Sequence, residues 1–452
     1  MSEAARDRRL GNLSTPINVQ KLQAALHAKA KEEPGYRFYA LYDKVYRTDV
    51  LAHAYACCKA NGGAAGVDAE RFEDIEAYGV DRWLGELAQA LRNRVYQPQA
   101  VRRVYIPKPN STKKRPLGIP PICDRVVETA ALLILAPIFE TDLQPEQHAY
   151  RPGRSALSAV KQVHSLLSTG HTDVIEGDLS GYFDSIPHAE LLTSVARRVS
   201  DRHLLHLIKM WLTTPVEETD ERGCKRRSTR NRDSKRGTPQ GSPISTLLAN
   251  LYMRRFVLGW KILGCERRFN ARIVNYADDF VICCKSQAAE AMTAMRGMMG
   301  RLKLTVNEDK THICRLPDDS FDFLGYNFGR CYSTKTGRPY LGTRPSKKSI
   351  KHILEAVHMH TARSMELLDA TEVVQRLNWA LSGWANYFQL GPVTKAYRFV
   401  DAYTTRRLRR WLCSKHKHPG SGRTRYPDEY LYQTLGLIRL PMSLRRLPWA
   451  KA

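Results

Sequence analysis

The sequence predicts an α+β body followed by an all-helical C-terminal part. Up to about residue 335, short stretches in which apolar and polar residues alternate are interleaved with stretches of helical spacing. Beyond Arg338, apolar residues recur at steps of three, four or seven residues and form one helix face; they are Val373, Leu377, Leu381, Trp384 and Phe388. The length of 452 residues suits about three structural units at roughly 150 residues each. We therefore place a domain boundary near 335–345.

The elements of the body follow from local patterns. A polar N-terminal helix is expected within 1–35, and a helix over 36–60 ends at the Asn61-Gly62-Gly63 turn. Alternation over 100–106, followed by a basic tip and a second short strand up to Pro120, predicts a β-hairpin. The other expected elements are helices over 70–95, 121–140, 155–169, 188–213, 242–262, 287–302 and 395–417, and strands over 174–178, 272–275, 280–284, 303–307 and 321–328.

The charge of the chain points to a polyanionic partner. Its 71 Lys and Arg residues exceed its 45 Asp and Glu residues and give a formal net charge of +26. Nucleic acid explains such an excess, and a membrane surface is the alternative. We expect no membrane association, because the N-terminus is charged and the longest apolar run, over 130–139, is about half of what a bilayer requires. The ten cysteines include no CxxC pair, which favours reduced thiols over disulfides or a zinc site.

Two strongly basic segments are candidates for contacts with phosphate groups. Residues 222–236 contain a single acid, Asp233, show no apolar period, and are expected to form a loop. The second segment, 402–417, lies on an expected helix. Charge runs are often simply solvated, but arginines here suit phosphate contacts and stacking on RNA bases. The candidate residues for binding nucleic acid are Arg226, Arg227, Arg230, Arg406, Arg407 and Arg410.

Adjacent carboxylates stand between two apolar strands in the segment Tyr276-Ala277-Asp278-Asp279. Two such charges repel one another, and a divalent cation removes this penalty. A solvated acidic turn is the alternative, as is a helix-capping role for Asp178. However, Asp178 ends another apolar strand, and if the two strands are neighbours in one sheet, all three acids meet at one edge. Three acids suit two Mg²⁺ ions, one activating an attacking hydroxyl and one stabilising a leaving phosphate.

The order of several motifs resembles that of the reverse transcriptases encoded by group II introns. The central series is DLSGYFD at 178–184, GTPQGSP at 237–243 and YADD at 276–279. Further similar motifs occur along residues 35 to 440: NGGAAGVD at 61–68, RPLGIP at 115–120, YRPG at 150–153, NEDKT at 307–311, FLG at 323–325 and GWANYF at 383–388.

This resemblance implies roles for individual residues. It makes Asp178, Asp278 and Asp279 catalytic and, with the backbone carbonyl of Leu179, ligands of two Mg²⁺ ions. It puts the ring of Phe183 under the incoming sugar, where the ring excludes a 2′-hydroxyl, although the neighbouring Tyr182 is an alternative.

The remaining implied residues bind the nucleotide. Gln240 packs near the nascent base pair, and Arg115 and Lys108 hold the triphosphate, a role for which cations on a hairpin are suited on physical grounds as well. Lys310 donates a proton to the departing pyrophosphate. For Lys108 and Lys310, a plain surface lysine is the competing interpretation.

The resemblance also implies an architecture and an activity. It predicts a right-hand polymerase with fingers, an antiparallel palm sheet and a helical thumb. We divide the chain into an N-terminal extension (1–35), fingers and palm (36–335), a helical thumb or maturase domain (336–425) and a short tail (426–452) without an endonuclease domain. The implied function is that of an RNA-directed DNA polymerase that binds its group II intron RNA to assist splicing and copies that RNA into DNA during intron mobility.

The implied partners are the intron RNA, a DNA target and deoxynucleoside triphosphates, in a bacterial-type cytoplasm or nucleoid. Two alternatives remain open from the sequence. One is a host-adopted reverse transcriptase in repair or defence. The other is an RNA-binding splicing factor whose polymerase site is vestigial, an interpretation that the intact aspartates disfavour.

Overall fold

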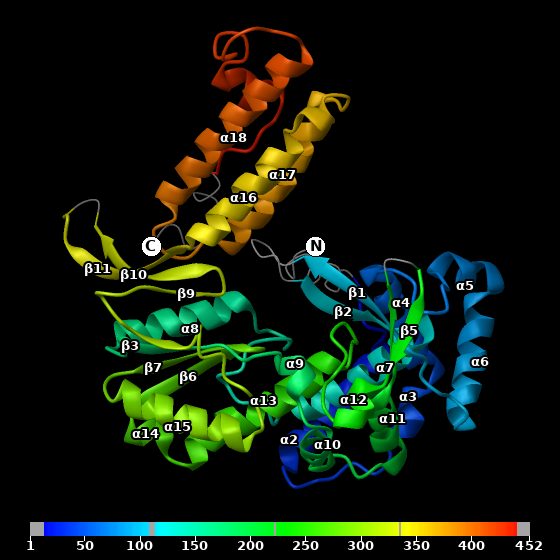
Figure 1. Cartoon of the computed structure of the whole chain (residues 1–452). Helices are drawn as coiled ribbons and strands as arrows, with labels where there is room; N and C mark the ends of the chain where they lie inside the picture. The colour runs from blue at the N-terminus through cyan, green and yellow to red at the C-terminus, as the bar shows by residue number, and fades with distance from the viewer. Residues whose placement is uncertain (1–12, 108–113, 221–222, 334–335, 441–452) are drawn as a thin grey trace. The chain divides into compact units, whose positions relative to one another are not determined.

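A computed structural model of the chain describes residues 13–107, 114–220, 223–333 and 336–440, and it has a mixed α/β fold with largely antiparallel sheets (Figure 1). Its longer helices are α2 (Ile17–Glu32), α4 (Thr48–Asn61), α6 (Val80–Arg92), α7 (Ile122–Glu140), α8 (Ala156–Ser168), α10 (His188–Ala196), α11 (Arg202–Thr213), α13 (Ser245–Ile262), α15 (Ala288–Arg301), α16 (Lys347–His360), α17 (Ala370–Tyr387) and α18 (Thr394–Lys415). The shorter helices are α3 (Tyr42–Val45), α5 (Phe72–Tyr78), α9 (Tyr182–Ser185), α12 (Arg230–Ser234) and α14 (Cys265–Arg268), with a 3-10 turn (Arg363–Met365) and a π turn (Tyr430–Thr434).

The strands form three sheets. They are β1 (Val101–Pro107), β2 (Lys114–Ile119), β3 (Asp173–Gly177), β4 (Val216–Thr219), β5 (Lys225–Ser228), β6 (Ala271–Tyr276), β7 (Asp279–Cys284), β8 (His312–Arg315), β9 (Phe321–Phe323), β10 (Tyr326–Tyr332) and β11 (Pro339–Pro345). The strand orders are β2-β1-β4-β5, β11-β10-β9 and β6-β7-β3-β8. Most elements expected from the sequence are confirmed within a few residues.

The chain divides into two compact units, each built from several segments. The first unit comprises Met1–Ser155, Gly177–Phe280 and Ala289–Thr311, and the second comprises Ala156–Glu176, Val281–Ala288 and His312–Ala452. The boundary predicted near 335–345 falls inside the second unit and stays a prediction for the functional domains.

The first unit is organised around α7. This apolar helix packs against α2, α4 and α3, and most of its residues are buried. The predicted hairpin is confirmed as the antiparallel pair β1 and β2, in which Arg102 lies opposite Ile119 and Ile106 lies opposite Arg115. On its other side, β1 pairs with β4 in parallel.

The expectation that 222–236 is a loop is wrong over most of its length. Strand β5 pairs antiparallel with β4, and α12 follows it. The pairing places Arg227 opposite Glu217, and Arg227 Nε lies 2.9 Å from Glu217 Oε2. Residues 225–228 form a strand because a neighbouring strand supplies backbone bonds and a charge partner, and no apolar period within the segment indicates either of these.

The helix expected over 188–213 is two helices, α10 and α11. Asp201 begins the second helix by accepting hydrogen bonds from the backbone N–H groups of His203 and Leu204. Its other oxygen accepts bonds from the N–H groups of Leu41 and Tyr42, both at 2.8 Å. Asp201 therefore starts a separate helix, α11, and ties its N-terminus to the segment at Leu41 and Tyr42.

Two further strand expectations are corrected. The strand expected over 321–328 is a hairpin, β9 and β10, because Leu324 and Gly325 both have positive φ angles, 49° and 79°, and turn the chain. Instead of a strand over 303–307, the structure has one isolated antiparallel bridge, between Val306 and Leu179.

In the second unit, the long helix α16 packs against both α17 and α18 (Figure 1). The predicted apolar face of α17 is confirmed as core, since Val373, Leu377 and Leu381 are fully buried. The unit is not all-helical beyond Arg338, because β11 pairs with β10 along seven residues of each strand. Pro339 and Pro345 bound β11 and hide its strand character in the sequence.

None of the described helices is long and apolar enough to cross a bilayer. All ten cysteines are free, as expected, and eight of them are buried.

Candidate active site

The turn that carries Asp278 and Asp279 joins β6 to β7. Ala277 takes a positive φ of 57°, which a tight two-residue hairpin requires. The fully buried Asn275 holds this turn from inside, because its side-chain amide donates to the backbone oxygens of Ala277 (2.9 Å) and Asp279 (3.3 Å). The backbone of Asn275 is itself held in a bridge to Gln147. The two carboxylates therefore project from a rigid support.

The structure brings Asp178 to the same edge of the sheet as this turn. Strand β3, which ends at Gly177, is the neighbour of β7, which begins at Asp279. Gly177 packs directly against the ring of Phe280, so closely that a Cβ atom at Gly177 would overlap the ring. Burial, and after it the negative charge of Asp278, raise the pKa of Tyr182 well above its usual value, which puts Asp278 near the segment that follows Asp178.

Asp178 is held by the turn at 307–311. Its Oδ2 accepts a hydrogen bond from Asn307 Nδ2 at 2.7 Å and an ion pair from Lys310 Nζ at 3.2 Å. The backbone N–H of Asp178 donates to Thr311 Oγ1 at 3.3 Å. The ammonium group of Lys310 thus partly neutralises the Asp178 carboxylate, and the motif at 307–311 contributes directly to the site.

The bridge between Leu179 and Val306 orients the carbonyl of Leu179. The hydrogen bonds that flank it run from Ser180 N to Thr305 O and from Asn307 N to Asp178 O, both at 2.9 Å. Leu179 and Val306 are therefore a non-hydrogen-bonded pair, in which the carbonyl of Leu179 points away from Val306. The donor set on this edge is three carboxylates and one backbone carbonyl, all oxygen ligands, which fits a hard divalent cation such as Mg²⁺.

Two other predicted residues, Arg115 and Gln240, lie close together in the first unit. Arg115 Nε is 3.4 Å from Gln240 Oε1, and Gln240 Nε2 is 3.4 Å from Asp184 Oδ2. The backbone brings them together, since Gly118 N donates to Gln240 O at 2.5 Å. Gly241, at a φ of +115°, approaches the carbonyl of Gly118 too closely for any side chain. Gln240 therefore links the β1–β2 hairpin to α9.

The aromatic pair after Asp178 divides into two roles. The hydroxyl of Tyr182 donates to the backbone oxygen of Ala249 at 2.6 Å, which commits this ring to packing on α13. Phe183 makes no such polar bond, and its backbone oxygen accepts from Thr238 N at 2.7 Å. Of the two alternatives from the sequence, Phe183 is the better candidate for a ring that contacts a sugar. Lys108 lies outside the described residues.

Sequence reasoning missed Asn275, Asn307 and Glu128 as supports of this site. Glu128 on α7 is buried and accepts a hydrogen bond from Ser242 in the 237–243 motif at 2.5 Å. Burial raises the pKa of Glu128 to about 8. A carboxylate in the middle of an apolar helix pattern is the sequence signal for the contact of Glu128. Asn307 stands in the 307–311 motif, but its role was not predicted, and Asn275 carries no such signal.

Comparisons with known proteins identify the family of the chain. The family described as reverse transcriptase (RNA-dependent DNA polymerase) matches residues 106–328. The family described as group II intron, maturase-specific domain, matches residues 350–430. Protein YkfC of Escherichia coli K12 is 33% identical over 372 residues, which cover 73% of this chain and 93% of YkfC. The chain belongs to the family of group II intron reverse transcriptases and maturases.

Other relatives carry names from the same family. The group II intron-encoded protein LtrA of Lactococcus lactis is 33% identical over 352 residues, which cover 64% of this chain and 56% of LtrA. A 91 kDa protein in the cob intron of Schizosaccharomyces pombe is 24% identical over 418 residues, which cover 76% of this chain and 50% of that protein. The chain thus spans about half the length of these two relatives.

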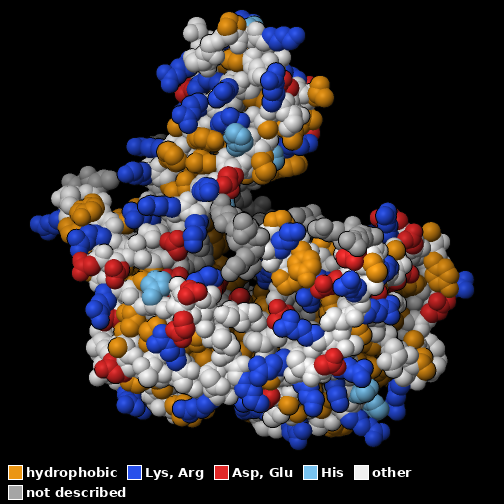
Figure 2. Space-filling view, in the orientation of Figure 1, with side chains coloured by type: hydrophobic (Ala, Val, Ile, Leu, Met, Phe, Trp, Pro, Cys, Tyr) orange, Lys and Arg blue, Asp and Glu red, His pale blue; other side chains and the backbone are white. Residues whose placement is uncertain are grey.

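The maturase-specific match covers α16 to α18, where Lys and Arg side chains gather on the surface (Figure 2). Arg406 and Arg410 are exposed on α18. Arg407 instead binds the end of α16, donating to Thr361 Oγ1 at 3.1 Å and Thr361 O at 3.0 Å. In the first unit, Arg226 and Arg230 are exposed, and Arg227 is exposed but paired with Glu217.

Proposed function

We propose that this chain is an RNA-directed DNA polymerase that also binds its intron RNA to assist splicing and copies that RNA into DNA during intron mobility. One observation carries the polymerase part: Asp178 and the Asp278–Asp279 turn lie at the ends of neighbouring strands. The backbone carbonyl of Leu179, next to Asp178, points away from Val306, its bridge partner. The two family matches, 106–328 and 350–430, support the polymerase and maturase parts respectively.

The proposed architecture is that of a right hand. Fingers and palm occupy 36–335, with the palm on the β6-β7-β3-β8 sheet, and a thumb or maturase domain occupies 336–425, after an N-terminal extension (1–35) and before a tail (426–452). The gap between the two family matches, at 329–349, is compatible with this boundary.

The proposed cofactor is a pair of Mg²⁺ ions held by Asp178, Asp278, Asp279 and the carbonyl of Leu179. When bound, these ions lower the pKa of an attacking hydroxyl and offset the charge on a leaving phosphate. Asn275 and Asn307 keep the carboxylates in place before substrate arrives. The support for this assignment is the all-oxygen donor set.

The other residues act on the deoxynucleoside triphosphate. The 3′-hydroxyl of the primer loses its proton to solvent and its oxygen forms a bond to the α-phosphorus. The bond between that phosphorus and the bridging oxygen breaks, and pyrophosphate leaves with the electron pair. Arg115 binds phosphate oxygens as the hairpin closes, and Lys108 is proposed to assist it. Lys310, already beside Asp178, donates a proton to the pyrophosphate. Phe183 blocks a 2′-hydroxyl, and Gln240 supports the nascent base pair.

Binding of RNA and DNA is assigned to the basic surfaces. Arg226 and Arg230 on the first unit, and Arg406 and Arg410 on α18, are exposed and suited to phosphate contacts. The proposed partners are the group II intron RNA and a DNA target, in a bacterial-type cytoplasm or nucleoid.

Primer extension on an RNA template with Mg²⁺ and deoxynucleotides tests the polymerase. The wild-type chain is expected to extend the primer, and Asp278→Ala is expected to lose activity by about 1,000-fold or more, since a metal ligand contributes several kcal/mol. Asp81→Ala, at an exposed acid of α6, is the matched control and should retain activity.

Two outcomes would overturn the proposal. Extension by Asp278→Ala at the wild-type rate would remove the carboxylates from the mechanism. A wild-type chain that binds intron RNA but makes no product above Asp278→Ala would favour a splicing factor without polymerase activity.

A further inference from the structure

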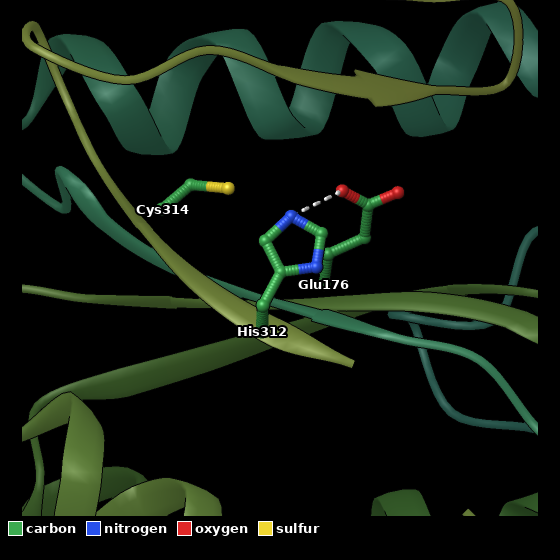
Figure 3. Close-up of side chains that lie close together, drawn as sticks. All are labelled: Glu176, His312 and Cys314. Carbon is green, nitrogen blue, oxygen red and sulfur yellow. Dashed lines mark ion pairs between the residues drawn. The ribbon is translucent and has the colours of Figure 1, made fainter. Parts of the chain in front are cut away.

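A second cluster of metal-binding side chains lies on the paired strands β3 and β8, within the second unit. Glu176, His312 and Cys314 each offer one ligand atom, and these atoms all lie within 4.8 Å of one another. Figure 3 shows the three side chains projecting to the same side of the strands. Among the residues that the structure describes, no other three Asp, Glu, His or Cys side chains, those of Asp178, Asp278 and Asp279 included, bring their ligand atoms this close together.

Strand geometry explains why the three side chains converge. His312 and Cys314 are two residues apart on β8, so their side chains point to the same face. Glu176 lies directly opposite His312 in the antiparallel register, and directly opposite residues share a face. The cluster is therefore built on a paired backbone, with two donors from one strand and a third from its partner.

We propose that Glu176, His312 and Cys314 bind a zinc ion. A carboxylate, an imidazole and a thiolate are the three kinds of side chain that Zn²⁺ accepts, whereas Mg²⁺ disfavours nitrogen and sulfur donors. Three protein ligands leave one coordination position for water. Binding replaces the proton of the Cys314 thiol with the metal and releases that proton to solvent.

The distances suit a tetrahedral ion. Zinc bonds of about 2.0–2.3 Å place two ligand atoms about 3.3–3.6 Å apart. Glu176 Oε2 and His312 Nε2 already lie 3.6 Å apart. The sulfur of Cys314, within 4.8 Å of both, reaches the remaining position by a small side-chain rotation.

The position of the site suggests what the ion does. Strand β8 is short, four residues, and lies at the end of the sheet order, where it has one neighbour. A metal bound across β3 and β8 joins this edge strand to the sheet and should stabilise the folded chain by an amount that rises with the logarithm of the free zinc concentration above the Kd. An ion pair between Glu176 and His312 beside an inert thiol is the competing interpretation.

Cobalt and zinc titrations of the full-length chain test the proposal. Protein freed of metal by a chelator is kept in millimolar Mg²⁺, so that the oxygen site around Asp178 carries Mg²⁺, and Co²⁺ is added. We expect about one Co²⁺ per chain with a thiolate-to-cobalt absorption band, which Zn²⁺ abolishes by displacement. A carboxylate site gives no such band, so the signal reports a cysteine ligand, and the variants identify which cysteine it is.

The variants separate the ligands from general effects on folding. Cys314→Ser should lose the band, whereas Cys331→Ser, which alters another buried cysteine of the second unit, should keep it. His312→Gln and Glu176→Gln, which retain the thiol, should weaken zinc binding at least about tenfold. Zn²⁺ should raise the Tm of the wild type and not that of Cys314→Ser. Absence of the band in the wild type, or its persistence in Cys314→Ser, would overturn the proposal.

Discussion

Gly177 stands immediately before Asp178, and the ring of Phe280, immediately after Asp279, fills the space where a side chain at Gly177 would lie. Gly177 and Phe280 thus contact each other where β3 ends and β7 begins, beside the three carboxylates. Any side chain at Gly177 has to push Phe280 away and move the Asp278–Asp279 turn with it.

Gly177→Ala is therefore expected to cost about 1–3 kcal/mol of folding free energy, as overpacking does in a buried site, and to lower primer extension. Phe280→Leu in the same chain removes ring atoms and should recover part of both losses. Urea unfolding and primer extension measure the two effects. Gly35→Ala, at a glycine with open space around it, is the control. Equal behaviour of the two alanine variants would show that the contact is unimportant.

Asn275 supports the same turn through two hydrogen bonds from one amide. Asn275→Ala leaves the backbone oxygens of Ala277 and Asp279 without these donors, which should destabilise the chain by about 1–3 kcal/mol. Because the turn carries two carboxylates, kcat should be lower than that of the wild type even at temperatures well below unfolding. The KM for deoxynucleotide should change less.

Asn327→Ala, which removes an amide bonded to Asp322 in the second unit, is the matched control for Asn275→Ala. It should lower stability and leave kcat near that of the wild type. Comparable kcat losses in both variants would mean that Asn275 acts through stability alone.

The carboxylates of the site could be predicted from the sequence, and their supports could not. Asp178, Asp278 and Asp279 follow apolar strands and belong to a recognisable series of motifs. The contact of Gly177 with Phe280 and the bond of Asn307 to Asp178 depend on which strands pair, which no local pattern states. The Glu176, His312 and Cys314 cluster could not be predicted because it contains no CxxC pair, and its third ligand comes from a partner strand.

At the scale of elements, α7 positions the start of α13. Glu128 accepts a hydrogen bond from Ser242, and the backbone of Ile244, at the N-cap of α13, also bonds to Glu128. Because burial raises the pKa of Glu128 from 4.5 to about 8, the folded chain retains a proton that the unfolded chain releases between these two pH values. Stability from this group is therefore complete below pH 4.5 and is lost as the pH rises through about 8.

Glu128→Gln keeps the shape of the side chain and removes its titration. The difference in unfolding free energy between wild type and Glu128→Gln should fall as the pH rises from 5 to 8.5, by at most about 1.4 kcal/mol per pH unit. Urea unfolding across this range measures it. Asp124, whose pKa burial raises to about 6, is present in both chains, and its charge is one of the causes that raise the pKa of Glu128. A constant difference would contradict the assignment.

Helix α18 offers a test of which arginines bind RNA. Arg406 and Arg410 are exposed, whereas Arg407 binds the carbonyl end of α16 at Thr361. Arg406→Ala with Arg410→Ala should weaken binding of structured group II intron RNA and reduce the slope of log affinity against log salt by about two. Fluorescence anisotropy at several salt concentrations measures this slope.

Arg407→Ala is the comparison for this pair. Loss of its bonds to the end of α16 should lower the Tm and change the salt slope less than the double variant does. If the double variant keeps the wild-type slope, the exposed face of α18 does not contact RNA phosphates.

Elements with a strong local pattern were predicted well, and elements made by pairing were not. The apolar run of α7 and the alternation of β1 carry their own signal. Strand β5 forms because Glu217 and the backbone of β4 lie beside a charged segment, and β11 forms because β10 pairs with it. In each case the partner strand lies only a short loop away in the sequence, but the pattern within the strand itself does not indicate the pairing.

At the scale of the whole molecule, a formal charge of +26 fits a protein that binds a polyanion. Three negatively charged side chains, Asp178, Asp278 and Asp279, nevertheless lie at neighbouring strand ends of this basic chain. The proposed Mg²⁺ ions would reconcile the two features, because a cation removes the repulsion among the acids and attracts the phosphates of a substrate.

Binding of Mn²⁺, measured by electron paramagnetic resonance as a substitute for Mg²⁺, tests this shared site most directly. Asp178→Asn and Asp278→Asn should each weaken the tightest Mn²⁺ binding by about tenfold or more, and the double variant should lose less than the sum of the two effects, because both carboxylates contact the same ions. If Asp178→Asn binds Mn²⁺ as the wild type does while Asp278→Asn does not, the two strand ends do not share a metal and the account fails.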